Sequence, residues 1–431
     1  HPYEGKELSE NKPVQVLEPK GNLVYPMSQH IGAPAKPLVS AGDRVLAGQK
    51  IGEAVGFISA NVIASVSGVV KAIEPRRVAG GGMSLSVIVE NDGQYETVEG
   101  VGQERNPESL SKDEIRSIVK EAGIVGMGGA GFPTHVKLTP KDDQAIDYIL
   151  VNGAECEPYI TADYRLMMEN PEAIVGGLKV ILQLFENAKG VIAVENNKPE
   201  AIKKLEALVA GEPRISVATL LTKYPQGGER SLIYAVTGRK VNSSMLPADV
   251  GCIVDNVDTV RAIYEAVCKS TPLMERIVTV SGDAVAEPGN FRVKLGTNGQ
   301  ELIDAAGGFK SEPEKVISGG PMMGMAMFTL DVPVAKTSSA FTCFTKDQVT
   351  AMEPTPCIRC GRCVSVCPSH IIPVKMMKAA LRDDCEEFER LNGMECMECG
   401  SCTYICPAKR PLTQAFKEMR KKVAANRRKK G

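Results

Sequence analysis

Two cysteine motifs with the same spacing place the tightest constraint on how this chain can fold. The first runs from Cys357 to Pro368 and the second from Cys396 to Pro407, and both follow the pattern C-x2-C-x2-C-x3-C-P. Cysteines at this interval in one tight loop can all turn their thiolates inward. The fourth cysteine, directly before the proline, begins the next element. The repeated pattern therefore predicts two iron–sulfur clusters in the C-terminal part of the chain.

This spacing resembles that of bacterial ferredoxins that hold two [4Fe–4S] clusters. In those proteins the fourth cysteine of each motif binds the cluster of the other motif. The resemblance therefore assigns each cluster three cysteines from one motif and one from the other. One cluster is assigned Cys357, Cys360, Cys363 and Cys406, and the other is assigned Cys396, Cys399, Cys402 and Cys367.

Zinc binding and disulfide formation are the two other uses of cysteine that have to be weighed here. Zinc ribbons use pairs of C-x2-C separated by a long loop, not triplets closed by Cys-Pro. Disulfides need an oxidising compartment, and the total of 13 cysteines is odd. The iron–sulfur interpretation is therefore favoured over both.

Length, charge and hydropathy exclude several other classes of protein. At 431 residues the chain is too long for one hydrophobic core, so several domains are expected. A formal net charge of −1 provides no overall attraction for nucleic acid. No apolar run approaches the roughly 18 residues that span a bilayer, and no signal peptide is visible. We therefore expect a reducing, cytoplasmic compartment and no transmembrane segment.

The N-terminal region is expected to contain an extended arm, over about residues 1–30, followed by a small β domain. From Pro37 to Glu74, short Val and Ile runs alternate with Gly-containing turn signals, which is typical of a barrel or sandwich. The order of these signals resembles biotinyl and lipoyl carrier domains, which carry an acylated lysine on a hairpin tip. Ile58 occupies that position here, so we expect the barrel-sandwich fold without acylation.

A glycine-rich loop, Gly126 to Thr134, follows a predicted helix that begins at Lys112. It contains G-x-G-x-x-G, but the dinucleotide fingerprint of this form must follow a strand, and this loop follows a helix. A glycine-rich backbone that turns into a helix can still cradle an anion, and Lys137 can neutralise a phosphate there. The alternative is a structural turn with a solvated lysine.

A predicted buried strand, Tyr148 to Asn152, leads into the sequence Gly-Ala-Glu-Cys-Glu-Pro. Strand ends in α/β sheets face the ligand crevice. Asn152 can offer a donor and acceptors there, as a flavin requires. Glu157 is expected to project its carboxylate into the crevice. The alternative for Glu155 and Glu157 is that both are ordinary surface carboxylates.

Three segments of this region together resemble the FMN- and NADH-binding flavoprotein of respiratory complex I. They are Gly126 to Lys137, Asn152 to Pro158, and Tyr224 with Glu229. The resemblance implies FMN contacts at Gly126, Gly128, Lys137, Asn152, Tyr224, Glu229 and Asn256. It implies NADH contacts at Phe132 and Glu157. Met127 and Ala154 depart from that family's pattern, which has Arg and Asp at these positions.

The region after the flavin domain begins with a predicted strand, Arg276 to Val280, and contains a short capped helix from Gly299 that ends near Gly307. This order resembles the β-grasp module that follows the flavin domain in complex I. A Met-containing loop, Gly319 to Gly324, is expected to serve packing or contact with another protein chain, because no Cys or His accompanies it.

The predicted fold is multidomain, mixed α/β and α+β. Its parts are residues 1–110 (arm and biotinyl/lipoyl-like barrel-sandwich domain), 111–270 (FMN- and NADH-binding α/β domain), 271–345 (β-grasp, SLBB-like domain), 346–416 (helical domain with two ferredoxin-type [4Fe–4S] motifs) and 417–431 (basic tail). The tail is expected to be a helix, either solvated or docked on an acidic partner or an anionic membrane.

This order of domains resembles the C component of the Rnf complex, the ion-translocating ferredoxin:NAD oxidoreductase of bacteria and archaea. The resemblance implies an enzyme component that exchanges hydride between NAD(H) and non-covalent FMN and passes single electrons through two [4Fe–4S] clusters. The cofactors supply that chemistry, so no catalytic side chain is assigned.

The same resemblance implies a location and a set of partners. The expected location is peripheral, on the cytoplasmic side of the cell membrane. The expected partners are other Rnf-type subunits, among them integral membrane subunits and a ferredoxin-like iron–sulfur protein. No nucleic acid partner is expected.

Three alternatives remain at this point. The first is a flavin and iron–sulfur cobalamin reductase, which shares much of this architecture. The second is a non-catalytic electron-wire protein that carries clusters but no flavin. The third is a zinc-stabilised scaffold, which predicts a colourless protein.

Overall fold

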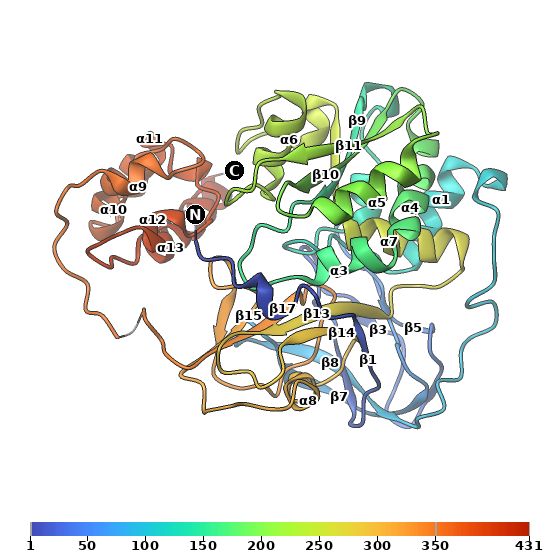
Figure 1. Cartoon of the computed structure of the whole chain (residues 1–431). Coiled ribbons are helices and arrows are strands. Elements are labelled where there is room, and N and C mark those ends of the chain that lie inside the picture. The colour runs from blue at the N-terminus through green and yellow to red at the C-terminus, as the bar shows by residue number, and fades with distance from the viewer. Residues whose placement is uncertain (1, 350, 431) are drawn as a thin grey trace.

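The computed structural model of the chain describes residues 2–349 and 351–430. Figure 1 shows a body that contains three sheet-based parts, and a helical C-terminal part that lies to one side of it. The chain between β17 (Ala340–Phe344) and the helical part is described over residues 345–349 and 351–361, which contain neither helix nor strand.

The N-terminal arm is not simply extended, because it contributes to a distant sheet. It contains a short 3-10 helix, η1 (Lys6–Leu8), and the strand β1 (Gln15–Leu17). β1 pairs in parallel with β14 (Gly289–Lys294), at the edge of the β-grasp sheet. The arm therefore fastens the start of the chain to a domain that lies more than half the sequence away.

The barrel-sandwich part consists of two small sheets packed face to face. Their orders are β2-β8-β7-β4 and β3-β5-β6. The strands are β2 (Leu23–Pro26), β3 (Lys36–Pro37), β4 (Arg44–Val45), β5 (Lys50–Glu53), β6 (Val62–Ile63), β7 (Gly68–Arg77) and β8 (Met83–Asn91). Leu23, Ile51 and Val89 are fully buried between the sheets. Ile58 lies in the connection from β5 to β6, 38% exposed, where a carrier domain has its lysine.

The α/β part is built on a four-stranded parallel sheet of order β11-β10-β9-β12. Its strands are β9 (Tyr148–Gly153), β10 (Lys189–Glu195), β11 (Ile215–Leu220) and β12 (Cys252–Asn256). The chain runs outward from β9 through β10 to β11 and then returns to the other side of β9 as β12. The strand order therefore reverses between β9 and β12, which is where ligands bind in open α/β sheets.

Helices surround this sheet and extend its hydrophobic core. They are α1 (Lys112–Glu121), α2 (Thr134–Lys137), α3 (Ala162–Glu169), α4 (Pro171–Leu184), α5 (Pro199–Val209), α6 (Glu229–Thr237) and α7 (Val257–Cys268). α1 begins as its sequence predicts, because Ser111 and Glu114 form a reciprocal capping box.

The β-grasp part has one mixed sheet of order β1-β14-β13-β17-β15-β16. Its remaining strands are β13 (Glu275–Ser281), β15 (Lys315–Ser318) and β16 (Met325–Met327). The predicted short helix is confirmed as α8 (Gly299–Ala305), with the Asn298 side chain accepting from the Gln300 N–H. Gly307 and Gly308 follow it with positive φ, which stops the helix.

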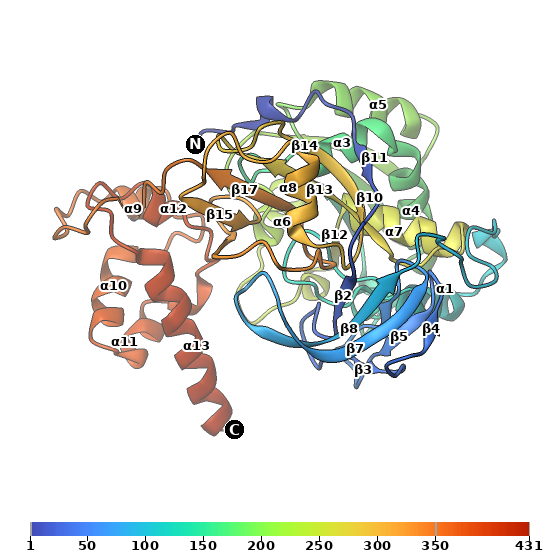
Figure 2. The ribbon, with the colours of Figure 1, turned by 90° about the horizontal axis from the view of Figure 1, so that it is seen from below.

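The C-terminal part packs five helices around a small core of Met376, Phe388, Phe416 and Met419. The helices are α9 (Arg362–Ser365), α10 (Pro373–Leu381), α11 (Cys385–Arg390), α12 (Ser401–Tyr404) and α13 (Leu412–Lys430). The basic tail is helical, as predicted, and Figure 2 shows α13 leading away from the body. α13 crosses the expected boundary at residue 416. None of the helices in the described ranges has the length and apolarity needed to cross a membrane.

A single buried lysine connects the three parts of the body. Lys336 is fully buried, and its Nζ donates to the carbonyl oxygens of Asn61, in the barrel-sandwich part, and Gly123, after α1. Its backbone N–H donates to Gln29 Oε1 at 3.0 Å. Lys336 therefore makes hydrogen bonds to both of the other parts of the body.

Candidate functional site

The glycine-rich loop lies between α1 and α2 and comes close to the end of β12. An added Cβ at Gly128 would lie 3.0 Å from Asn256 Cβ, so no larger residue fits without displacement. A Cβ at Gly129 would meet no atom of residues 2–349 and 351–430 within 4 Å. Gly131 has φ +73°, a conformation that glycine adopts readily. The loop therefore presents bare, exposed backbone beside the point where the strand order reverses.

Lys137 ends α2 with its ammonium group directed at β12. Its Nζ donates to the Val254 carbonyl at 2.8 Å and lies 3.4 Å from Asp255 Oδ1. The other carboxylate oxygen of Asp255 is buried without a hydrogen-bond partner among the described residues. Burial raises the pKa of Asp255, and Lys137 opposes that rise. Because an ammonium has three N–H donors, one remains for a ligand such as a phosphate.

Glu229 begins α6 close to this charged pair. Partial burial of its carboxyl raises the pKa of Glu229, Lys137 opposes the rise, and Asp255 adds to it. The residue as a whole is still exposed to solvent. Glu229 therefore lies at the rim of the site and not in its interior.

Asn152 and Asn256 face each other in register at the ends of β9 and β12. Asn152 Nδ2 donates to the Gly227 carbonyl at 2.9 Å. Asn256 caps α7 by accepting from the Asp258 N–H at 2.9 Å, and its Nδ2 donates to Asp163 at 2.7 Å. Both amides are thus held in place, and each keeps acceptor capacity for a ligand.

The alternative that Glu155 and Glu157 are surface carboxylates is wrong. Glu155 is 7% exposed and accepts from the backbone N–H groups of Asp163 (2.8 Å) and Tyr164 (3.3 Å), at the start of α3. Burial raises the pKa of both carboxyls.

The Glu157 carboxylate, which is expected to project into the crevice, is held by a distant loop. Its Oε1 accepts from the N–H groups of Met322 (2.6 Å) and Met323 (3.1 Å), in the Gly319–Gly324 loop. The reason is tertiary, because two backbone N–H groups of a distant loop meet this oxygen. A contact between Glu157 and NADH stays a prediction.

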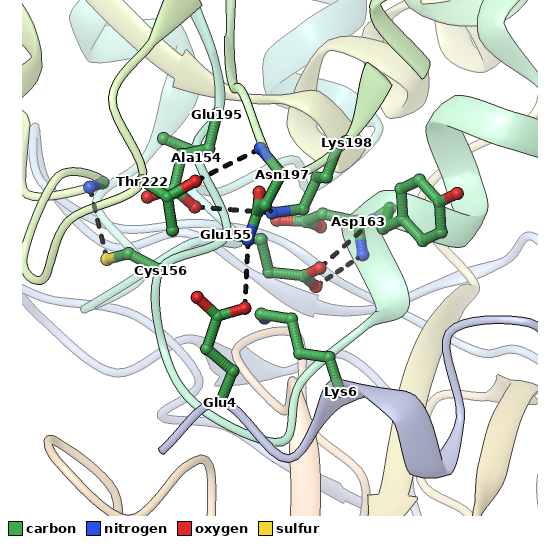
Figure 3. A network of polar contacts seen from close by, with 12 residues as sticks. Glu4, Lys6, Ala154, Glu155, Cys156, Asp163, Glu195, Asn197, Lys198 and Thr222 are labelled. Carbon is green, nitrogen blue, oxygen red and sulfur yellow. Dashed lines mark hydrogen bonds and ion pairs between the residues drawn. The ribbon is translucent and has the colours of Figure 1, made fainter. Parts of the chain in front are cut away.

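The N-terminal segment supports this side of the sheet. Figure 3 shows Lys6 beside Glu155, and the Lys6 Nζ donates to the carbonyl oxygens of Ile160 (2.5 Å) and Glu157 (3.1 Å). Burial lowers the pKa of Lys6, and Glu155 opposes that change. A second buried pair, Glu195 with Lys198 at 3.4 Å, lies at the end of β10. No local sequence signal marks Lys6, because its partners lie about 150 residues away.

Phe132 and Tyr224 lie in different segments, the glycine-rich loop and the turn before α6. Phe132 is partly buried, and its carbonyl accepts from the Gly126 N–H at 2.8 Å, which closes the glycine-rich loop. Tyr224 is 8% exposed, and its hydroxyl donates to the Cys399 carbonyl at 2.7 Å. Burial raises the pKa of Tyr224, and the Glu157 charge adds to the rise. Tyr224 therefore reaches the second cysteine motif, a contact that the sequence does not predict.

Two of the motif cysteines, Cys363 and Cys402, have thiol neighbours from both motifs. Burial raises the pKa of Cys363, and the nearby thiols of Cys357 and Cys406 raise it further. Burial likewise raises the pKa of Cys402 to about 12, and its contributing neighbours are Cys396, Cys399 and Cys367. These neighbours are the ones that the sequence assigns to a shared cluster, although the ligand sets themselves stay a prediction.

Both cysteine loops have the same backbone shape. Arg359 and Glu398 occupy equivalent positions with φ +56° and +55°, and Gly361 and Gly400 follow with φ +76° and +81°. These left-handed residues turn each loop tightly. Within residues 2–349 and 351–430, no three Cys, His, Asp or Glu side chains are gathered as for one metal ion.

Profiles of four protein families match successive parts of the chain. A barrel-sandwich hybrid domain named for RnfC matches residues 1–94, and the Nuo51 FMN-binding domain matches 119–265. An SLBB domain matches 277–326 and a 4Fe-4S dicluster domain matches 351–407. The predicted fold class is therefore confirmed, while the exact domain limits stay predictions.

Relatives with established names align over nearly the whole chain. The C component of the proton-translocating ferredoxin:NAD(+) oxidoreductase complex of Clostridium ljungdahlii is 46% identical, over 97% of this chain and 92% of the relative. The Na(+)-translocating counterpart of Acetobacterium woodii is 45% identical, over 100% of this chain and 97% of the relative. Among solved structures, an NAD+-reducing [NiFe]-hydrogenase matches with a TM-score of 0.50 and 18% identity, over 74% of this chain and 62% of that one. That likeness concerns the fold alone.

Proposed function

The chain belongs to the family formed by the C components of ion-translocating ferredoxin:NAD(+) oxidoreductase complexes, and from this premise we propose which residues perform its electron transfer. Proteins of this family are oxidoreductase components that bind FMN and [4Fe–4S] clusters and use NAD(H). FMN suits this junction because it exchanges hydride with a nicotinamide and single electrons with clusters.

The FMN site is proposed at the ends of β9 and β12. The observation that carries this assignment is the meeting of Gly128, Asn152 and Asn256 where the strand order reverses. Gly126 and Gly128 admit the ligand to the backbone, and Lys137 directs its remaining N–H at a phosphate. Asn152 and Asn256 orient the flavin. Tyr224 and Glu229 form the rim on the side of α6.

NAD(H) is proposed to bind on the outer side of the glycine-rich loop, against Phe132 and Glu157. In this proposal Phe132 offers an apolar ring to the nucleotide. Glu157 accepts from a ribose hydroxyl or the nicotinamide amide, and a carboxylate there disfavours a phosphorylated dinucleotide by like-charge repulsion. Glu157 Oε1 already accepts two backbone N–H bonds, and the Tyr224 hydroxyl also lies close to this carboxylate.

The two clusters are proposed to carry single electrons between this site and the rest of the complex. Their ligands are Cys357, Cys360, Cys363 and Cys406 for one, and Cys396, Cys399, Cys402 and Cys367 for the other. The chain is one member of a complex of several proteins. We propose that it lies peripherally on the cytoplasmic side of the membrane and contacts integral membrane subunits and a ferredoxin-like iron–sulfur protein.

Lys137 provides the sharpest test of the flavin site. Lys137→Ala should weaken FMN binding by about 1.5–3 kcal/mol, the scale of a hydrogen bond to a charged group. Iron content should stay at about eight per chain, as two [4Fe–4S] clusters require. Flavin content after dialysis and the visible spectrum of anaerobic protein with and without NADH give the measurement. Lys141→Ala, on an exposed lysine outside the site, is the matched control. Full flavin retention in Lys137→Ala would contradict the phosphate role.

A further inference from the structure

The two cysteine loops are equivalent in sequence but lie in different surroundings. All residues from 351 to 362 are exposed, including Cys357 and Cys360. From Glu395, directly before the second loop, to Thr403, all residues are buried or partly buried, and Cys399 is 8% exposed. The tertiary structure therefore distinguishes two loops that the spacing of cysteines leaves identical.

The second loop is packed against the α/β part. The hydroxyl of Tyr224 donates to the carbonyl of Cys399 at 2.7 Å. The methyl group of Met397 lies 2.8 Å from the position that a Cβ on Gly228 would take. Glu395 accepts from Arg230 at 2.9 Å, one residue before the loop begins. These three contacts hold the second loop on the turn that precedes α6 and on the first turn of α6 itself.

The same turn reaches the proposed flavin site. Its residue Gly227 accepts from Asn152 Nδ2 at 2.9 Å, at the end of β9. Tyr224 lies in the same turn, so one short stretch of backbone separates Asn152 from the Cys399 carbonyl. The second loop is also approached from the β-grasp side, because the Met322 carbonyl lies 2.7 Å from a Cβ position on Gly400.

We propose that the cluster bound by the second loop exchanges electrons directly with the flavin. The cluster bound by the exposed loop then exchanges electrons with the partner protein. Tyr224 is the positioning residue that holds the second loop next to the flavin site. Electron transfer slows steeply with distance, and the protein sets that distance. One NADH releases two electrons and one proton overall. Each cluster takes up one electron, and the proton leaves to solvent. This order rests on the ligand sets and the flavin site given under the proposed function.

Two equivalent substitutions test the order in the full-length, anaerobically purified chain. Cys399→Ser removes the second-loop cluster, because a hard oxygen replaces thiolate poorly, and Cys360→Ser removes the exposed-loop cluster in the same way. In Cys360→Ser, NADH should reduce the remaining cluster rapidly, seen as its electron paramagnetic resonance signal. In Cys399→Ser, NADH should bleach the flavin but leave the remaining cluster oxidised, while dithionite still reduces it.

If NADH reduced the remaining cluster in Cys399→Ser but not in Cys360→Ser, the proposed order of electron transfer would be wrong. Failure of NADH to bleach the flavin in the unmodified chain would instead overturn the proposed function, so the two failures are distinguishable.

Tyr224→Phe tests the positioning role without removing a ligand. It should shift the reduction potential of one cluster only, namely the one whose signal is missing in Cys399→Ser. It should also slow cluster reduction by NADH by roughly fivefold, with FMN retained. Tyr234→Phe, on an exposed tyrosine of α6, should change neither quantity. A shift of the other cluster, or no shift at all, would refute the role given to Tyr224.

Discussion

Several ionisable side chains of this molecule are held by backbone carbonyls, and Lys336 is the clearest. It is fully buried, and burial lowers its pKa to about 7. Its hydrogen bonds to Asn61 and Gly123 replace those it loses to water. The residue therefore joins three parts of the body at the cost of removing an amine from solvent.

This burial predicts a pH dependence of stability. The lysine pKa is about 10.4 in an unfolded chain and lower in the folded one, so the unfolded chain binds more protons between about pH 7 and pH 10. The contribution of Lys336 should therefore increase as pH rises through that window, and fall as pH drops toward 7. Urea unfolding of the unmodified chain and of Lys336→Ala, at pH 7 and pH 9, gives the measurement.

The difference in unfolding midpoint between the two proteins should be larger at pH 9. Lys141→Ala, at an exposed lysine, should show no such change with pH. A difference that shrinks at pH 9 would contradict the lowered pKa of Lys336.

At the scale of elements, the two cysteine loops show how one local shape acquires two environments. Gly361 and Gly400 occupy the same position of the repeat and both have positive φ. Around Gly361 no atom of the described residues lies within 4 Å of an added Cβ, whereas at Gly400 the Met322 carbonyl lies at 2.7 Å. Comparing substitutions at Gly361 and Gly400 therefore distinguishes the effect of backbone strain from the effect of packing around the second loop.

Alanine at each of these glycines gives a matched prediction. Gly361→Ala should cost only the left-handed conformation, roughly 1–2 kcal/mol. Gly400→Ala adds a clash with backbone, so it should also displace the second loop from the Gly319–Gly324 loop. Reduction of the clusters by NADH, followed after rapid mixing, should be slower in Gly400→Ala than in Gly361→Ala. Equal rates in the two variants would show that the contact with Met322 does not position the second loop.

At the scale of the whole molecule, the helical part is attached to the body mainly through the second loop and the residues next to it. Glu395 accepts from Arg230 at 2.9 Å and from the Ser243 N–H at 2.9 Å. The described residues of the covalent connection, 345–349 and 351–361, form neither helix nor strand. The orientation of the clusters toward the flavin site therefore depends on a few contacts between the parts.

Loss of Glu395 should loosen this attachment. The Arg230–Glu395 pair is partly exposed, so Glu395→Ala should cost about 1 kcal/mol or less in global stability. Cleavage of the connecting segment by a protease should nevertheless become faster, because the helical part leaves the body more often. Glu389→Ala is the control, since Glu389 pairs with Arg427 inside the helical part. Unchanged proteolysis in Glu395→Ala would refute the anchoring role.

The sequence by itself determined the features that depend on neighbouring residues. The spacing of Cys357 to Cys367 and its repeat defined two tight loops, because a turn of this kind is closed within a few residues. Asn152 was placed at a strand end by the apolar run before it, and the helix from Lys112 was predicted from its pattern and confirmed. The family resemblance added the order of domains, which the comparisons confirmed.

Only the tertiary structure decided which residues from distant segments meet. β1 joins the β-grasp sheet, Lys6 lies beside Glu155, and Glu157 accepts from the Met322 N–H. None of these contacts leaves a local pattern, because each depends on how separate domains pack. The same holds for the two cysteine loops, because their equal spacing does not indicate which of them is buried. Packing on Tyr224 buries one loop and leaves the other exposed, and that asymmetry exists only in three dimensions.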